Sequence, residues 1–261
     1  NRLSILGVQL DQEKLDKVYE EFLKLADKKK DINDDDILVL AGANRTQNHR
    51  IKLEYLQVTS GVGVRSVASL GLNISGEKFE AAASGNGPVD AAIKALKKIF
   101  VIENSTAWNP NMRSKSAIRT SDTRYFTDPS IATAALGMGP DDLINDLSTF
   151  GLFFETLCVR DLRVYADALG GSVYHFRDKN GLECDAVVHL RNGKYGLIEV
   201  KLGGDKLIEE GARNLVTLES KIDTDKMKSP SFKMVLTGVG KYAYQRPQDG
   251  VYVVPVGCLR D

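Results

Sequence analysis

The sequence predicts a mixed fold, with an α+β front module followed by an α/β back module. The front module, residues 1–98, begins with helical segments and continues in the order βββα. The back module, residues 99–261, has the order αβββαβ. Two observations give this prediction: apolar residues recur at helical spacing in some segments, and they alternate with polar residues in others, between turns that contain Gly and Asn. A chain of 261 residues is long enough for two small domains.

The overall composition is that of an ordinary globular protein. Hydrophobic residues make up 43% of the chain and charged residues 27%. The 35 basic and 35 acidic residues balance one another, which excludes the net positive charge typical of nucleic-acid binders. Any surface that binds nucleic acid must therefore be a local cluster of basic residues.

Cysteine usage and hydropathy predict a cytoplasmic protein. The three cysteines form no CxxC pair and lack a histidine at zinc spacing, which favours a reducing compartment. No apolar run approaches the ~18 residues that cross a bilayer, so we expect no membrane partner. The chain begins Asn1-Arg2-Leu3 without Met, and we expect it to be truncated, with an upstream domain missing.

The first 47 residues are predicted to be helical. A helix capped by Asp11 runs to about Lys29, and a second helix begins at Asn33 and ends near Gly42. The acidic run 34–36 has two interpretations, a calcium loop or a set of acids that match the helix dipole. The second is favoured, because the Gly and the distal Glu of a calcium loop are not present. The apolar face of the first helix comprises Leu15, Val18, Tyr19, Phe22, Leu23 and Ala26.

Residues 48–98 are predicted to form three strands and a helix. The strands cover 51–59, 64–74 and 77–83, and in the first one Ile51, Leu53 and Tyr55 are expected on one face. The turn at 61–63 has two glycines of a phosphate loop, but it lacks the third and opens a strand, so a hairpin is favoured. The last helix begins at Gly85-Asn86-Gly87-Pro88 and ends near Ile99. Its bare N–H groups suit a carboxylate ligand, although a plain helix start is the simpler interpretation.

These segments resemble a known regulatory region. Residues 15–40 resemble the linker subdomain of 2-isopropylmalate synthases, while 53–61 (LEYLQVTSG) and 85–92 (GNGPVDAA) resemble the first βββα unit of their C-terminal regulatory domain. The resemblance implies leucine binding between two such units and self-association through the βββα unit. It places half of a leucine site at Gly85, Gly87 and Pro88. It implies no synthase activity here, because the catalytic barrel of that family is not present.

The back module is predicted to begin with a strand at 100–103 and an irregular segment at 104–128. This segment holds a local cluster of bases near Trp108, and two interpretations remain equal: a surface that tracks a phosphate backbone, or a solvated loop. Short helices are expected at 130–136 and 140–147. The candidate nucleic-acid residues are Arg113, Lys115, Arg119 and Arg124.

A longer helix and five strands complete the predicted back module. The helix covers 150–169 and ends at Gly170-Gly171. Hairpin turns at 178–181 and 192–193 separate the first three strands, and a helix at 205–222 precedes the last two. The expected strands are 172–177, 182–190, 195–201, 231–238 and 250–257.

Four polar side chains in these elements form a candidate catalytic site. Asp185 lies on one strand, and alternation places Glu199 and Lys201 on the same face of the next strand. Mg²⁺ prefers such oxygen ligands, so Asp185, Glu199 and Glu155 are the candidate metal ligands, and Lys201 would hold or deprotonate the attacking water. The alternative is a surface Glu–Lys ion pair, but apolar neighbours on both strands favour a buried site. This element order and these residues are those of the PD-(D/E)XK, or restriction-endonuclease-like, nuclease fold.

A second resemblance covers residues 100–261. The segments 108–115 (WNPNMRSK), 128–130 (DPS), 153–155 (FFE), 182–185 (LECD) and 250–255 (GVYVVP) resemble the C-terminal domain of many bacterial and archaeal AAA-type ATPases. The resemblance implies a nuclease-like domain. No Walker A motif is present, so it implies no ATP hydrolysis.

The sequence therefore gives two hypotheses about function. In the first, the chain is chimera-like or truncated, and its back module is a Mg²⁺-dependent nuclease-like domain that binds nucleic acid. In the second, the chain is not an enzyme, and the front regulatory module binds leucine or dimerises while the back module docks a partner. The join at 98–100 has no Gly, Ser or Pro linker, so we expect each module to keep its own fold.

Overall fold

A computed structural model of the chain describes residues 10, 12–26, 51–113 and 118–259. The chain divides into two units, residues 1–50 and 51–261. In the first unit the predicted helix is confirmed as α2 (Gln12–Ala26), with Tyr19 and Leu23 exposed. The second predicted helix, the acidic run 34–36 and Lys115 lie outside the described residues.

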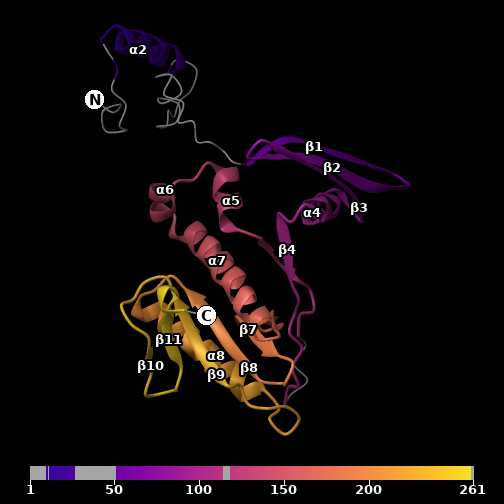
Figure 1. Cartoon of the computed structure of the whole chain (residues 1–261), viewed down its shortest axis with the longest axis vertical. Coiled ribbons are helices and arrows are strands. Elements are labelled where there is room, and N and C mark those ends of the chain that lie inside the picture. Colours follow the sequence, from indigo (N-terminus) through magenta and orange to yellow (C-terminus); the bar gives the residue numbers. More distant parts are fainter. Residues whose placement is uncertain (1–9, 11, 27–50, 114–117, 260–261) are drawn as a thin grey trace. The chain divides into compact units, whose positions relative to one another are not determined.

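The predicted βββα unit is confirmed. Its antiparallel sheet has the order β1-β2-β3, and α4 packs on one face (Figure 1). The central strand alternates, so that Leu70 and Leu72 are buried in one cluster with Ala95 of the helix. The elements are β1 (Ile51–Gly61), β2 (Val64–Ile74), β3 (Glu77–Gly85) and α4 (Pro88–Lys98).

One side-chain direction in β1 differs from the prediction. Leu53 pairs with Leu72, but Tyr55 pairs with Gly71, because the register shifts by one residue between them. A bulge of this kind sends the side chains that follow it to the other face of the sheet. Tyr55 therefore lies over Gly71 on the face opposite α4, where a Cβ at Gly71 would approach its ring to 2.5 Å. The expectation that Leu53 and Tyr55 share a face was wrong.

The back module contains a six-stranded sheet of order β10-β11-β9-β8-β7-β6. The first three strands in the sequence pair antiparallel, and β8, β9 and β11 pair parallel. The five predicted strands are confirmed, but the two-residue β10 was too short for its pattern to be seen. The strands are β6 (Gly171–Arg177), β7 (Glu183–Leu190), β8 (Tyr195–Lys201), β9 (Phe232–Thr237), β10 (Tyr244–Gln245) and β11 (Tyr252–Pro255), followed by the short 3-10 helix η1 (Val256–Cys258).

Two helices cover opposite faces of this sheet and form two cores. Leu197 of β8 packs with Leu215 of α8 (Asp205–Lys221), whereas Ile198 packs with Val159 of α7 (Leu147–Ala168). Successive strand residues point to opposite faces, so both faces of β8 are buried. The mixed α+β class is thereby confirmed. Within the described residues, no helix is long and apolar enough to cross a membrane.

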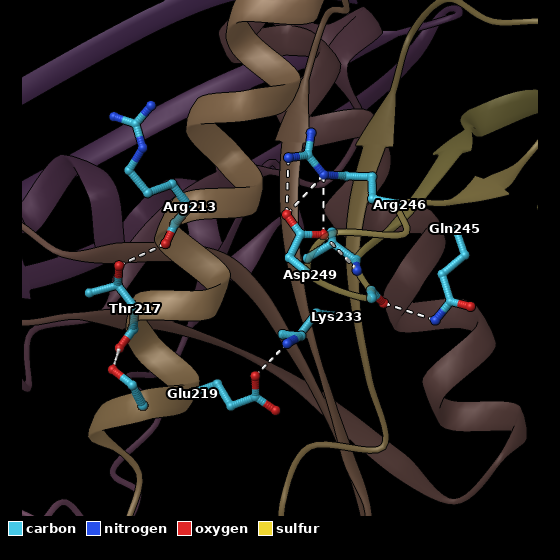
Figure 2. Close-up of polar contacts among 10 residues, drawn as sticks. Arg213, Thr217, Glu219, Lys233, Gln245, Arg246 and Asp249 are labelled. Carbon is cyan, nitrogen blue, oxygen red and sulfur yellow. Dashed lines mark hydrogen bonds and ion pairs between the residues drawn. The ribbon is translucent and has the colours of Figure 1, made fainter.

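Ion pairs fasten α8 to the sheet and its edge. Figure 2 shows Glu219 of α8 paired with Lys233 of β9, and Arg246 paired with Asp249 in the turn before β11. The Arg246 guanidinium also contacts Glu209 of α8 at 2.6 Å. With 8% of its side chain exposed, Arg246 lies largely buried, and two carboxylates offset the cost of burying its charge.

The segment between the two modules is part of the folded structure. The strand predicted at 100–103 is present, shifted by two residues, as β4 (Ile102–Ser105). It pairs with β5 (Thr123–Phe126), which lies in the segment predicted to be irregular. Val101 is buried in one cluster with Leu70 of the βββα unit, and Phe126 packs against that cluster. The helices α5 (Pro129–Leu136) and α6 (Pro140–Asn145) follow. Residues 51–261 form one compact unit that includes this segment.

Candidate active site

The end of the β7–β8 ladder positions Asp185. The last cross-strand pair joins Ala186 to Ile198, and beyond it the Asp185 carboxylate replaces the strand as acceptor for the Val200 N–H, at 2.8 Å. A register shift between β6 and β7 lies beside this point, between Tyr174 and Phe176 on β6. Such irregularities re-aim a side chain out of the regular alternation.

The next strand brings Glu199 and Lys201 to the same place. The Lys201 Nζ lies 2.6 Å from Glu199 Oε2 and 3.7 Å from Asp185 Oδ2. Gly211 of α8 makes room for both residues, because a Cβ there would lie 3.3 Å from Glu199 Cβ and 3.5 Å from Lys201 Cε. The Glu199 side chain is 1% exposed, so its charge depends on Lys201 for compensation.

Glu155 lies on the helix that covers the other face of the sheet. It lies on α7, and its Oε1 accepts a hydrogen bond of 2.6 Å from the Tyr125 hydroxyl. The charges of Asp185 and Lys201 both act on it. Asp185, Glu199 and Lys201 therefore meet, whereas the hydrogen bond of Glu155 is to Tyr125. No pattern in the sequence pointed to Tyr125, since its segment was predicted to be irregular.

The crowded carboxylates have raised pKa values. Burial and then the charge of Asp185 raise the pKa of Glu155 to about 7 and that of Glu199 to about 8, although Lys201 acts in the other direction on both. Burial also raises the pKa of Asp185. Although burial opposes it, the attraction of Asp185 and Glu199 raises the pKa of Lys201 above its ordinary range. Lys201 is thus an ammonium at neutral pH.

These shifts predict a stability that falls with rising pH. The folded state binds protons that the unfolded state, with an ordinary glutamate pKa of 4.5, has released. The protonated carboxyls contribute fully to the free energy of unfolding below about pH 4.5. This contribution is lost as the pH rises through about 7 for Glu155 and about 8 for Glu199. The free energy of unfolding in urea should fall from pH 6 to pH 9 by more in the wild type than in Glu199→Gln. The glutamine keeps the shape of the side chain but cannot ionise. Parallel curves for the two proteins would contradict the prediction.

The site has some of the groups that a divalent cation needs. In the part of the chain that the structure describes, no three His, Cys, Asp or Glu side chains form a group able to hold a metal ion. Lys201 contacts two of the predicted ligands instead. However, Glu199 Oε1 is buried and accepts no hydrogen bond, and Mg²⁺ needs only one or two carboxylates besides water and substrate phosphate. Asp185 and Glu199 therefore fit such an ion.

The predicted basic cluster is divided among different roles. The Arg113 guanidinium donates to the Ile222 carbonyl and the Thr224 hydroxyl, both at 2.9 Å, and so fastens its loop to the end of α8. Arg119 and Arg124 are exposed. Trp108, the aromatic residue of this cluster, is buried between Phe176 and Tyr195. It belongs to the core and is not free to stack on a base.

The glycines of the predicted half site have structural roles in the βββα unit. A Cβ on Gly85 would lie 2.4 Å from the backbone nitrogen of Ala91, so a side chain there would separate β3 from α4. Gly87 caps α4 in an extended conformation, and Pro88 occupies the first turn, where its missing N–H costs nothing. The Asp90 carboxylate accepts the Asn86 N–H at 2.9 Å. Leucine binding stays a prediction.

The front of the chain has known relatives. Residues 31–107 match the LeuA allosteric (dimerisation) domain. A 2-isopropylmalate synthase of Parabacteroides distasonis is 71% identical over 105 residues, which are 40% of this chain and 21% of that protein. Those of Pelotomaculum thermopropionicum (42% over 113 residues) and Heliobacterium modesticaldum (37% over 142 residues) match 42% and 51% of this chain. The chain spans only 21%, 22% and 28% of the three relatives. The predicted resemblance of the front module is confirmed.

The back of the chain matches a different family. Residues 150–259 match a domain of unknown function, DUF4143. This match contains Glu155, Asp185, Glu199 and Lys201, but its description assigns them no activity. The LeuA match extends through β4, and the segment with Trp108 and Tyr125 lies between the two matches. The resemblance to nucleases thus stays a proposal.

Proposed function

We propose that the back module is a divalent-cation-dependent phosphodiesterase that acts on nucleic acid. The observation that carries this proposal is the meeting of Asp185, Glu199 and Lys201 at the end of the β7–β8 ladder. The charges of Asp185 and Lys201 also act on Glu155 of α7. Three acids with raised pKa values and one ammonium leave the site short of positive charge. A divalent cation would supply that charge, and a phosphate would bring further oxygen ligands.

The residues have distinct roles in this reaction. Bound Mg²⁺ would lower the pKa of a water and offset charge on the phosphate. Asp185 and Glu199 would hold the ion, and Lys201, already protonated, would donate a hydrogen bond that positions the attacking water or the phosphate oxygen. Because its pKa is raised, Lys201 suits the role of a donor better than that of a general base. Glu155 would accept a proton from the water or orient it.

Removing the cation, or one of its ligands, tests the proposal. The full chain is incubated with single- and double-stranded DNA and RNA in Mg²⁺ or EDTA. Cleavage is expected only with Mg²⁺, and Asp185→Asn should lower it at least about 100-fold, since the ion contributes several kcal/mol to the transition state. Asp167→Asn, an exposed change on α7, is the matched control. Cleavage in EDTA, or equal cleavage by Asp185→Asn, would remove the proposal.

We further propose that the LeuA region mediates self-association and takes leucine between two βββα units. The match to a dimerisation domain supports this, as does the surface of β1. Leu53, Leu56 and Val58 pair with β2 residues that face α4, yet the three are 53%, 50% and 39% exposed. An apolar strip left open beside a helix suits a second unit of the same kind.

A charge on this strip should disrupt the assembly. Leu56→Asp is expected to weaken self-association at least about 10-fold, the effect of losing more than 1 kcal/mol at a buried contact. Gln57→Asp adds the same charge on the opposite face of β1 and serves as the control. Sedimentation equilibrium with and without leucine measures both variants. A monomeric wild type, indifferent to leucine in calorimetry, would rule out this second function.

A further inference from the structure

A hydroxyl outside the DUF4143 match holds one of the candidate catalytic carboxylates. Tyr125 lies on β5, is 8% exposed, and donates to Glu155 Oε1 at 2.6 Å. Residues 150–259 form the match, so this contact comes from the preceding segment. Tyr125 and Glu155 are 30 positions apart, and the antiparallel pairing of β4 with β5 fixes the strand that carries Tyr125.

Tyr125 is itself held in place. The Arg163 guanidinium lies 5.7 Å from the centre of its ring, in a cation–π contact. Arg163, on α7, binds Glu103 Oε2 at 2.5 Å through its Nη1. Because Arg163 and Glu155 lie two turns apart on one helix, the ring is fixed against the helix that carries its acceptor.

We propose that Tyr125 is a positioning residue of the candidate active site, which fixes the orientation of the Glu155 carboxylate. The inference rests on the proposed function, because only a cation site gives the carboxylate a task. A hydrogen bond to one oxygen restricts rotation of the carboxylate and leaves the other oxygen for a water or an ion. Such outer partners orient the groups that act on a metal.

The support for this residue extends into the LeuA-matched region. Glu103 lies on β4, inside residues 31–107, and it is the residue that pairs with Arg163. A series of contacts therefore runs from Glu103 through Arg163 and Tyr125 to Glu155. The support of Tyr125 thus includes β4, a strand that lies inside the LeuA match.

A double-mutant cycle on the full chain tests the role of Tyr125. Mn²⁺ affinity is measured by electron paramagnetic resonance, and kcat and KM are measured for Mg²⁺-dependent cleavage, in Tyr125→Phe, Glu155→Gln and the double variant. Tyr125→Phe is expected to lose about 10–100-fold in Mn²⁺ affinity or kcat, with the KM for nucleic acid unchanged. The double variant should lose no more than Glu155→Gln, because the hydroxyl acts through that carboxylate.

A control variant and a second test variant separate positioning of the carboxylate from simple packing. Tyr165→Phe removes a hydroxyl elsewhere on α7 and should leave the Mn²⁺ affinity and kcat unchanged. Glu103→Gln weakens the support of the ring and should produce a smaller loss in the same direction. It also keeps the test available if Tyr125→Phe folds poorly.

The outcomes distinguish failure of the positioning role of Tyr125 from failure of the proposed phosphodiesterase function. A wild type that binds Mn²⁺ and cleaves, with Tyr125→Phe unchanged or with losses that multiply in the double variant, overturns the positioning role alone. A wild type that neither binds Mn²⁺ nor cleaves overturns the proposed function and this inference together.

Discussion

Lys201→Met is expected to lose phosphodiester cleavage by roughly 10²–10⁴-fold, the contribution typical of a positioned proton donor or acceptor. The Lys201 ammonium contacts the carboxylates of both Asp185 and Glu199, and no other lysine is paired with either carboxylate among the described residues. Methionine keeps much of the volume but provides neither the charge nor the hydrogen bonds. Initial rates on the substrate with highest wild-type activity measure the loss.

The same variant should also lose stability in a pH-dependent way. At about pH 9 Glu199 is ionised and buried, and removing its partner should cost about 3–5 kcal/mol of the free energy of unfolding. At about pH 6 Glu199 is protonated, so the cost should be smaller. Lys194→Met, an exposed lysine at the other end of β8, is the control for loss of one positive charge. Full activity of Lys201→Met, or an equal loss of stability at both pH values, would contradict this account.

Trp108→Ala should destabilise the back module by about 3–5 kcal/mol, as the removal of a large buried aromatic side chain does elsewhere. Trp108 is 5% exposed, and its ring lies 6.3 Å from that of Phe176 and 5.0 Å from that of Tyr195. It belongs to the core that α8 covers. Urea unfolding, followed by far-ultraviolet circular dichroism so that the loss of the single tryptophan does not matter, measures the effect.

An exposed aromatic residue provides the matched control for Trp108. Tyr242 is 70% exposed, and its replacement by Ala should change the free energy of unfolding by less than about 0.5 kcal/mol. Equal effects of the two substitutions would show that the segment between the two family matches is not part of the fold. This segment would then be a linker, as the interpretation of residues 104–128 as a solvated loop implies.

Local patterns in the sequence predicted most of the strands and helices. The hairpin turn at 192–193 indicated the start of β8. The two-residue repeat of any strand then placed Glu199 and Lys201 on one face, because alternation is a property of the strand alone. β5 and β10 were missed, since strands of four and two residues have too few positions to show a period. The side-chain direction of Tyr55 was wrong because a bulge depends on the partner strand, which the pattern of β1 does not contain.

The sequence by itself determined the element order, the pairing of Glu199 with Lys201 on one face, and the resemblance of the front module to a leucine-responsive regulatory region. Only the tertiary structure decided that Trp108 is buried, that Arg113 is bound to the end of α8, and that Tyr125 holds Glu155. The physical reason is distance along the chain. Tyr125 and Glu155 are 30 positions apart and Arg113 and Ile222 are 109 apart, so only the packing of the whole module brings their atoms within hydrogen-bond distance.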